Sequence, residues 1–151
     1  MTDHTGYMRL ALAQAEIAAS EGETPIGAVL VRGEEVIAAT RNARERLRDP
    51  TAHAEVLALR EGAAKLGYRR LNDCTLYVTL EPCPMCTGAM IMSCLGQCFF
   101  GASDPKQGCC ESLYALASDP AFYWQVPCAG GLLAEEAQAL LTAFFAKRRN
   151  P

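Results

Sequence analysis

The first apolar pattern in the chain has the spacing of a helix. Apolar positions recur at near-helical intervals across residues 7–20, and Gly22 is a suitable stop. The positions that set this spacing are Met8, Leu12, Ala15 and Ile17. Two short apolar runs follow, residues 28–31 and residues 36–38, with Gly33 between them, which predicts a β-hairpin.

Helical and extended patterns alternate through the rest of the chain. Thr51 is a candidate N-cap for a helix that runs to about Lys65. A second internal helix is expected to open at Pro82 or Pro84, where the missing N–H of proline does no harm, and to run to about Ser93. The other expected elements are strands at 75–80 and 97–101, a short helix near 111–118, a weak strand near 125–128 and a last helix over 134–147. Such alternation indicates an α/β sandwich with helices packed on a sheet.

The composition is that of an ordinary globular domain. The 151 residues are 50% apolar and 21% charged, so we expect one domain spanning residues 1–151. No apolar run approaches the roughly 20 residues that span a bilayer, and no secretory pattern opens the chain. We therefore expect a cytoplasmic protein with no membrane partner. The net charge of −3 argues against general coating of nucleic acid but leaves room for a local basic patch.

Cysteine is abundant, with 8 residues, but a disulfide framework is not needed by a chain with this many core-forming residues. Cys74, Cys94 and Cys98 lie in or beside apolar segments and are expected to be small buried hydrophobes. Cys109-Cys110 and Cys128 have no assigned role. Only Cys83 and Cys86 have the spacing of metal ligands.

Two short motifs carry the chemistry, His53-Ala54-Glu55 and Pro82-Cys83-Pro84-Met85-Cys86. One imidazole and two thiolates can hold a zinc ion and leave its fourth position for water, which is typical of a catalytic rather than a structural site. Cys83 and Cys86, at i and i+3, share one face of the predicted helix, whose positive end favours thiolates. The chain has only one other histidine, His4, in what looks like a loose terminus, so we expect the imidazole ligand to be His53.

Glu55 has two interpretations. Residues at i and i+2 do not share a helix face, so Glu55 would have to reach the cavity from a different side than His53. It either moves protons beside the metal or only complements the helix dipole, and local geometry leaves both open. Glu81 is a rival carboxylate, which its position at a strand end makes more suited to a supporting or helix-capping role.

Beyond these ligands the sequence resembles the bacterial tRNA-specific adenosine deaminases (the TadA family), whose wider superfamily shares the H-x-E and P-C-x-x-C motifs. The resemblance covers nearly the whole chain. The segments that carry it are residues 24–31, Asn42, 49–55, 76–86, Gly88-Ala89, Phe100-Gly101-Ala102 with Asp104 and Lys106, and Phe144-Phe145 with the basic end that follows.

The resemblance implies a three-layer, cytidine-deaminase-like α/β sandwich, a five-stranded mixed sheet with helices on both faces. It implies one zinc ion per subunit on His53, Cys83 and Cys86, with Glu55 as the proton shuttle. The implied reaction is hydrolytic deamination of adenosine to inosine at the wobble position of a tRNA anticodon, by a homodimer whose partner subunit helps to build the RNA cleft.

The same resemblance implies contacts to the substrate. Asn42 would bond the flipped base, beside Pro25, Ile26, Ala54 and the backbone amides near Leu80. Asp104 and Lys106 would meet the anticodon loop. Phe145, with the basic residues Lys147-Arg148-Arg149, would meet nucleotides near the target.

The chain departs from the common family pattern at Tyr123-Trp124, Cys94 and Glu111. The aromatic pair Tyr123-Trp124 could stack on a base or fill a dimer groove. Two other functions are compatible with the motifs. A deaminase of a free base such as guanine or cytosine would keep the zinc, Glu55 and Asn42 but need no basic rim. A non-catalytic, zinc-stabilised binding module would need a fourth protein ligand, for which a spare cysteine is the candidate.

Overall fold

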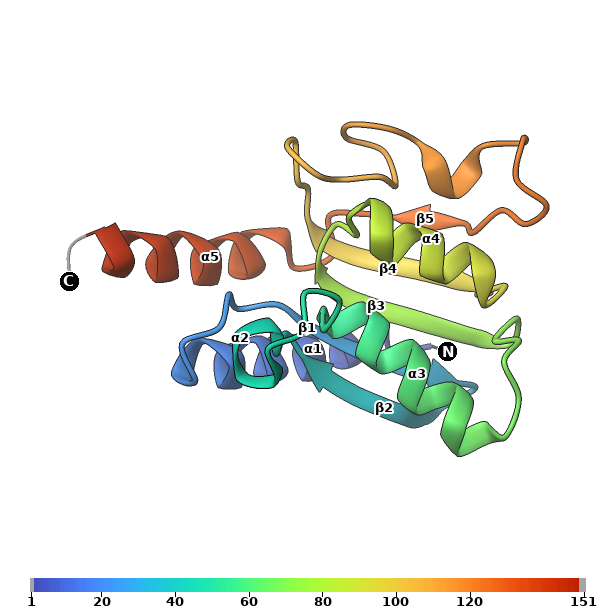
Figure 1. Cartoon of the computed structure of the whole chain (residues 1–151), viewed down its shortest axis with the longest axis horizontal. Coiled ribbons are helices and arrows are strands. Elements are labelled where there is room, and N and C mark those ends of the chain that lie inside the picture. The colour runs from blue at the N-terminus through green and yellow to red at the C-terminus, as the bar shows by residue number, and fades with distance from the viewer. Residues whose placement is uncertain (1, 150–151) are drawn as a thin grey trace.

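The computed structural model describes residues 2–149, the side chain of Arg149 excepted. Its centre is a five-stranded sheet in the order β2-β1-β3-β4-β5 (Figure 1). The strands are β1 (Gly27–Arg32), β2 (Glu35–Arg41), β3 (Cys74–Leu80), β4 (Gln97–Ala102) and β5 (Cys128–Ala129). β1 pairs antiparallel with β2 and β3, whereas β3–β4 and β4–β5 are parallel. The predicted mixed sheet of five strands is confirmed.

Helices cover both faces of this sheet, which confirms the three-layer sandwich. α3 (Ala54–Leu66) and α4 (Pro84–Met92) lie on one face, and α1 (His4–Ser20) and α5 (Ala134–Arg149) lie on the other. In Figure 1, α5 extends well beyond the edge of the sheet.

Buried side chains alternate between the two faces of the sheet along each strand, and so form two hydrophobic cores. Leu30, Leu76 and Phe100 belong to the cluster that includes residues of α3 and α4. Val29 and Tyr77 belong to the cluster that includes residues of α1 and α5. Because successive strand residues point to opposite faces, one nearly continuous apolar run supplies both cores.

The N-terminal helix begins earlier than its apolar spacing predicts. The Asp3 side chain accepts a hydrogen bond from the Gly6 N–H at 2.9 Å and so caps α1. His4 Nδ1 is 2.6 Å from the Tyr77 hydroxyl, and its ring centroid is 4.3 Å from that of Phe99. The expectation that His4 lies in a loose terminus is therefore wrong, because two residues distant in sequence hold its ring.

Two other local predictions are also wrong. Thr51 does not cap α3, because the helix begins at Ala54 with His53 in the N-cap position. The Thr51 N–H and hydroxyl instead donate to Asp49 Oδ1, at 2.8 and 2.7 Å, in a turn before the helix. Only a single 3₁₀ turn, Leu116–Ser118, forms where a helix over 111–118 was expected. A short helix that was not predicted, α2 (Arg44–Leu47), interrupts the loop before Asp49.

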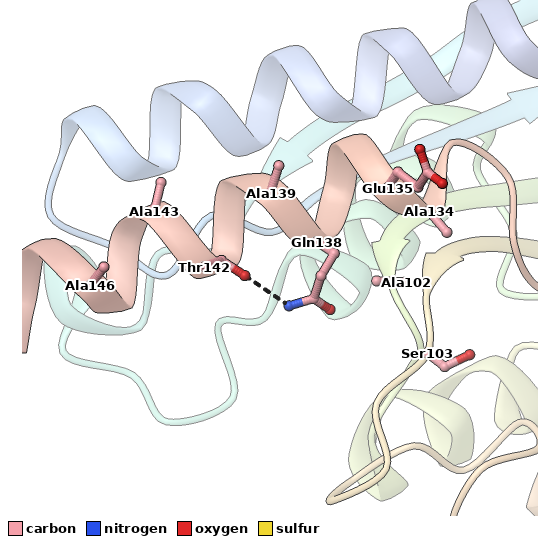
Figure 2. A pocket seen from close by; sticks show the side chains of 9 residues that line it. All are labelled: Ala102, Ser103, Ala134, Glu135, Gln138, Ala139, Thr142, Ala143 and Ala146. Atoms are coloured by element: carbon pink, nitrogen blue, oxygen red, sulfur yellow. Dashed lines mark hydrogen bonds between the residues drawn. The ribbon is translucent and has the colours of Figure 1, made fainter.

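α5 and the residues at the end of β4 border a groove of about 770 Å³ (Figure 2). Its lining is mostly alanine and small polar residues, and the one ionisable side chain among them is Glu135. The residues that line it are Ala102, Ser103, Ala134, Glu135, Gln138, Ala139, Thr142, Ala143 and Ala146. None of them is a predicted site residue, so the chemistry lies elsewhere.

No helix in the part of the chain that the structure describes is long and apolar enough to cross a membrane.

Candidate active site

The candidate metal ligands stand at the starts of two neighbouring helices. His53 precedes α3 and Cys83 precedes α4, each in an extended conformation with ψ of 150° and 177°. Neither side chain caps its own helix, so the imidazole and the thiol are free to turn toward each other. Pro84, in the first turn of α4, fits there because that N–H would have no partner in the helix.

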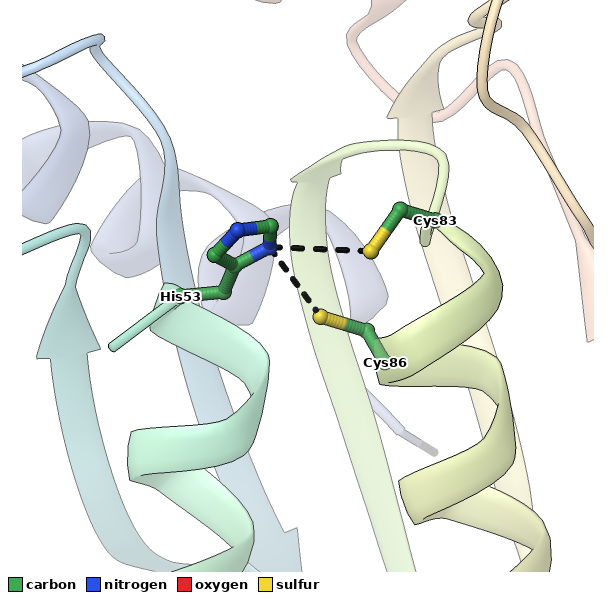
Figure 3. A group of neighbouring side chains, drawn as sticks. All are labelled: His53, Cys83 and Cys86. Atoms are coloured by element: carbon green, nitrogen blue, oxygen red, sulfur yellow. Dashed lines mark hydrogen bonds between the residues drawn. The ribbon is translucent and has the colours of Figure 1, made fainter. Parts of the chain in front are cut away.

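His53, Cys83 and Cys86 converge on one point (Figure 3). His53 Nδ1 lies 3.6 Å from Cys83 Sγ and 3.4 Å from Cys86 Sγ, and all three atoms lie within 4.8 Å of one another. A tetrahedral zinc ion with Zn–S near 2.3 Å and Zn–N near 2.0–2.1 Å separates nitrogen from sulfur by about 3.6 Å. The donor set therefore fits zinc in chemistry and in spacing.

The two candidate thiol ligands shift each other's pKa values in opposite directions. The hydrogen bonds with Cys86 and with His53 lower the pKa of Cys83 to about 4. The hydrogen bond with Cys83 and burial raise the pKa of the Cys86 thiol. The hydrogen bond with Cys83 raises the pKa of His53. A cation bound here would replace these protons.

Glu55 reaches the same site from the first turn of α3. Its side chain is 4% exposed, and burial raises the pKa of its carboxyl to about 7. It hydrogen-bonds the Cys86 thiol, so it lies beside the ligands rather than on the solvent face of α3. His53, just before α3, and Glu55, in its first turn, both line the cavity. A role for Glu55 in proton transfer requires this position.

A cavity of about 130 Å³ opens at this point. Among the residues expected to contact the base, Asn42, Ile26, Ala54 and Leu80 line it, whereas Pro25 does not. The residues that line it are Ile26, Asn42, Arg44, His53, Ala54, Glu55, Leu80, Glu81, Cys83, Asp104 and Gln107.

Main-chain contacts hold Asn42 at the cavity. Its side chain is buried, its Nδ2 donates to the Thr24 carbonyl at 3.2 Å and its Oδ1 accepts from the Arg44 N–H at 3.3 Å. These two bonds fix the orientation of the amide and leave it a further donor and acceptor.

A second, outer cleft of about 460 Å³ adjoins the cavity and shares Leu80, Asp104 and Gln107 with it. It brings together Asp104, Lys106 and Phe145, which the resemblance assigns to RNA contacts. The Asp104 side chain accepts from the N–H groups of Lys106 and Gln107, so it also forms the turn expected of an Asp-Pro sequence.

The basic end of α5 is partly engaged within the chain. Arg148 donates to the Gly22 carbonyl at 2.7 Å, and its guanidinium lies 4.8 Å from the centroid of the Phe144 ring. The side chain of Arg149 lies outside the described residues. Of the unusual aromatic pair, Trp124 bonds the Leu95 carbonyl at 2.9 Å and packs against the core, whereas Tyr123 is 67% exposed.

Sequence reasoning missed two residues that line the cavity, Arg44 and Gln107, because neither belongs to a motif. It also missed the role of the buried Glu23. Glu23 is 1% exposed and accepts from the N–H groups of Glu45 and Arg46, at 3.1 and 2.7 Å, at the start of α2. No local pattern reveals that bond, because its partners are more than twenty positions away.

Glu81 does not cap α4 as one interpretation expected. Its buried carboxylate instead accepts hydrogen bonds from the loop after β4. Cys74, Cys94 and Cys98 are buried, as predicted. Among the described residues, no other histidine, cysteine or carboxylate joins His53, Cys83 and Cys86 in a metal-holding group, which argues against a closed structural zinc site.

Known proteins share this architecture. The family model described as MafB19-like deaminase matches residues 2–147. A tRNA-specific adenosine deaminase of Bacillus subtilis (strain 168) is 46% identical over 99% of this chain and 93% of its own length. A tRNA-specific adenosine deaminase of Aquifex aeolicus (strain VF5) is 41% identical over 95% of each chain.

Solved structures are similar as well. One from studies of A-to-I editing by tRNA:A34 deaminases superposes with a TM-score of 0.88 at 41% identity, over 91% of this chain and 99% of that one. A guanine deaminase from Nitrosomonas europaea superposes with a TM-score of 0.84 at 25% identity, over 97% and 86% of the two chains. With a His/Cys/Cys donor set, a buried glutamate beside it and this extent of identity, the chain belongs to the MafB19-like deaminase family, alongside the tRNA-specific adenosine deaminases.

Proposed function

We propose that this protein is a zinc-dependent hydrolase that converts adenosine to inosine at the wobble position of a tRNA anticodon. The observation that carries the proposal is the buried Glu55 carboxylate beside a three-donor His/Cys/Cys set at a small cavity. The 46% identity to a tRNA-specific adenosine deaminase supports the choice of substrate.

His53, Cys83 and Cys86 would hold the zinc ion. When bound, zinc supplies a Lewis acid that makes water nucleophilic near neutral pH. Glu55 takes the proton of the attacking water and delivers it to the departing amine, so that adenosine and water become inosine and ammonia. Burial raises the pKa of the Glu55 carboxyl above its ordinary value, which suits a group that must both accept and release a proton.

Asn42 would recognise the edge of the extruded base with the donor and acceptor that its main-chain bonds leave free. Ile26, Ala54 and Leu80 would form the apolar walls. Extruding a base costs a few kcal/mol of unstacking, and the cost is smallest in a single-stranded loop. An anticodon loop is therefore a suitable substrate for a cavity of this size.

The outer cleft would take the nucleotides that flank the target. Lys106 supplies a positive charge for the backbone, and Phe145, 45% exposed, supplies a face on which a base can stack. Asp104 would accept hydrogen bonds from the loop. A local cationic and aromatic surface of this kind would let a chain with a net charge of −3 bind RNA.

We further propose a homodimer. Large apolar side chains are exposed at the end of α4 and in the segment between β4 and β5, with Met92 at 65%, Tyr114 at 62% and Tyr123 at 67% exposed. Exposed apolar groups gathered in one region suit a protein interface. Sedimentation of the zinc-loaded protein should give twice the monomer mass, and Tyr123→Arg should shift the mass toward that of the monomer.

A tRNA substrate would place the enzyme in the cytoplasm.

The test uses zinc-loaded protein and an anticodon stem–loop with adenosine at the wobble position, with inosine measured after nuclease digestion. Glu55→Ala should lower the rate by roughly 10²–10⁴-fold. The matched control is Glu61→Ala, an exposed glutamate on the same helix, which should leave the rate unchanged.

The second candidate is a deaminase of free guanine or cytosine, favoured by the similarity to the guanine deaminase structure. It would release ammonia from the free base and leave the stem–loop unchanged. Its activity should also be insensitive to salt, whereas binding that depends on RNA phosphates weakens as salt rises.

A further inference from the structure

Glu81 is buried without a cationic partner. Its side chain is 2% exposed, and no lysine or arginine side chain that the structure describes forms an ion pair with it. A buried carboxylate is costly unless hydrogen bonds compensate for the water that it loses. The identity of its donors therefore indicates what the residue is for.

All of its donors come from one loop, residues 104–112. Oε1 accepts from the Asp104 N–H at 3.0 Å and from the Ser112 hydroxyl. Oε2 accepts from the N–H groups at the far end of the loop, those of Cys110 at 3.2 Å, Glu111 at 2.9 Å and Ser112 at 2.9 Å. One carboxylate thus ties the first residue of the loop to its last three.

The loop closes tightly around this carboxylate. A Cβ added at Gly108 would overlap the Glu81 side chain, so only glycine fits at this point of the loop. The Cys109 N–H donates to the Pro82 carbonyl at 2.9 Å and holds the loop against the residue before Cys83. Loop 104–112 is therefore built on the strand end that carries Glu81.

The same loop presents side chains to the substrate. Asp104 and Gln107 line the inner cavity, and Asp104, Lys106 and Gln107 line the outer cleft. Five donors occupy the four or so lone-pair sites of the Glu81 carboxylate, so none is left to accept a proton from water. Glu55 has no comparable set of main-chain donors, and this separates the two carboxylates.

We propose that Glu81 is a positioning residue that fixes loop 104–112, so that Asp104, Lys106 and Gln107 meet the nucleotides flanking the target, and that it takes no part in proton transfer. This inference rests on the proposed function for its substrate, an RNA stem–loop. The hold of Glu81 on the loop does not depend on that function and can be measured separately.

Two measurements on the zinc-loaded full chain test the proposal. Glu81→Gln replaces an acceptor by an amide that faces N–H groups, so amide exchange at Asp104, Cys110, Glu111 and Ser112 should become at least about tenfold faster. The KM for the stem–loop should rise about 10- to 100-fold while kcat changes less than about threefold, because contacts made equally in both states act on KM.

Glu23→Gln is the matched control for the exchange measurement. Glu23 is equally buried and also accepts main-chain N–H groups, but those of Glu45 and Arg46. Its substitution should speed exchange at those two amides and leave loop 104–112 unchanged. A general loosening of the protein would instead speed exchange at both places in both variants.

Unchanged exchange in Glu81→Gln would overturn the proposal, and so would faster exchange with an unaltered KM. A fall in kcat of roughly 10²–10⁴-fold at constant KM would show that Glu81 transfers protons.

If Glu81→Gln does not fold, Ser112→Ala tests the proposal instead, because it removes one hydrogen-bond donor and keeps the carboxylate. That variant should raise both the exchange rate and KM, and the absence of both effects would contradict the proposal. A wild-type protein inactive on RNA would refute the proposed function and leave the exchange result standing.

Discussion

Nδ1 of His53 lies 3.4 Å from Sγ of Cys86, although the two residues are 33 positions apart and belong to the starts of different helices. The chain enters these helices after β2 and after β3, and the antiparallel pairs β1–β2 and β1–β3 bring the ends of those two strands to the same edge of the sheet. The sheet thereby brings two short motifs to one point, and each motif then uses a helix start, where backbone N–H groups favour negatively charged ligands.

Loss of a ligand should abolish zinc binding. We expect Cys86→Ala to reduce bound zinc well below one ion per chain and to stop inosine formation, because two remaining ligands seldom retain zinc in competition with buffer. Atomic absorption measures the metal, and Cys128→Ala, which removes a half-buried thiol from β5, is the control. Full zinc occupancy in Cys86→Ala would rule out the ligand set.

Removing the metal should make stability depend on pH through Glu55. Burial raises its folded-state pKa to about 7 from 4.5, so the stabilisation that comes from the protonated carboxyl is fully present below pH 4.5 and is lost as pH rises through 7. In chelator-treated protein, the wild type should therefore lose stability relative to Glu55→Gln as the pH is raised. The difference between their free energies of unfolding should change by about 2 to 3 kcal/mol from pH 5 to pH 8. Urea unfolding at both values measures this.

The comparison with Glu55→Gln cancels, to first order, the titration of His53, Cys83 and Cys86, which both proteins share. Zinc-loaded samples should show a smaller difference, because a nearby cation lowers the pKa of a carboxyl group. A constant difference across pH in the metal-free proteins would mean that Glu55 stays ionised in the fold.

Local patterns were sufficient for much of the fold and for the ligands. The strands Cys74–Leu80 and Gln97–Ala102 and the helix that starts at Pro84 are buried apolar runs with clear start signals, and each lies close to its predicted range. The His/Cys/Cys set could be predicted because metal ligands need particular residue types at particular spacings.

Sequence reasoning failed where a distant partner decides. The His4 ring is held by Tyr77 and Phe99, which lie far from it along the chain. Glu81 could be found beside the motif, but the loop that it holds begins more than twenty residues later. Periodicity carries no information about such pairs.

Phe145 should contribute to RNA binding and little to folding. Its ring is 45% exposed at the outer cleft and contacts Phe144 edge-on, with centroids 5.5 Å apart. Stacking on a base contributes about 1–3 kcal/mol, so Phe145→Ala should raise the KM for the stem–loop by roughly 5- to 150-fold. Thermal unfolding should change little.

The control for Phe145→Ala is Leu10→Ala, an equally exposed apolar residue on α1 that lies outside both cavities. It should leave the KM unchanged. Equal KM values for the two variants would show that Phe145 does not contribute to RNA binding.

The packing of α1 on the sheet should depend on the missing side chain of Gly27. A Cβ at this position would collide with the Ala11 carbonyl and lie 2.7 Å from the Ala15 N, and both are backbone atoms that cannot swing aside. Gly27→Ala should therefore lower the unfolding free energy by about 1–3 kcal/mol, as overpacking does elsewhere.

The matched substitution is Gly88→Ala in α4, where nothing lies within 4 Å of an added Cβ. Alanine is also the better helix former, so this substitution should be neutral or stabilising by up to about 1 kcal/mol. Urea unfolding of the zinc-loaded proteins measures both, and equal effects of the two substitutions would show that α1 can move away from β1 at little cost.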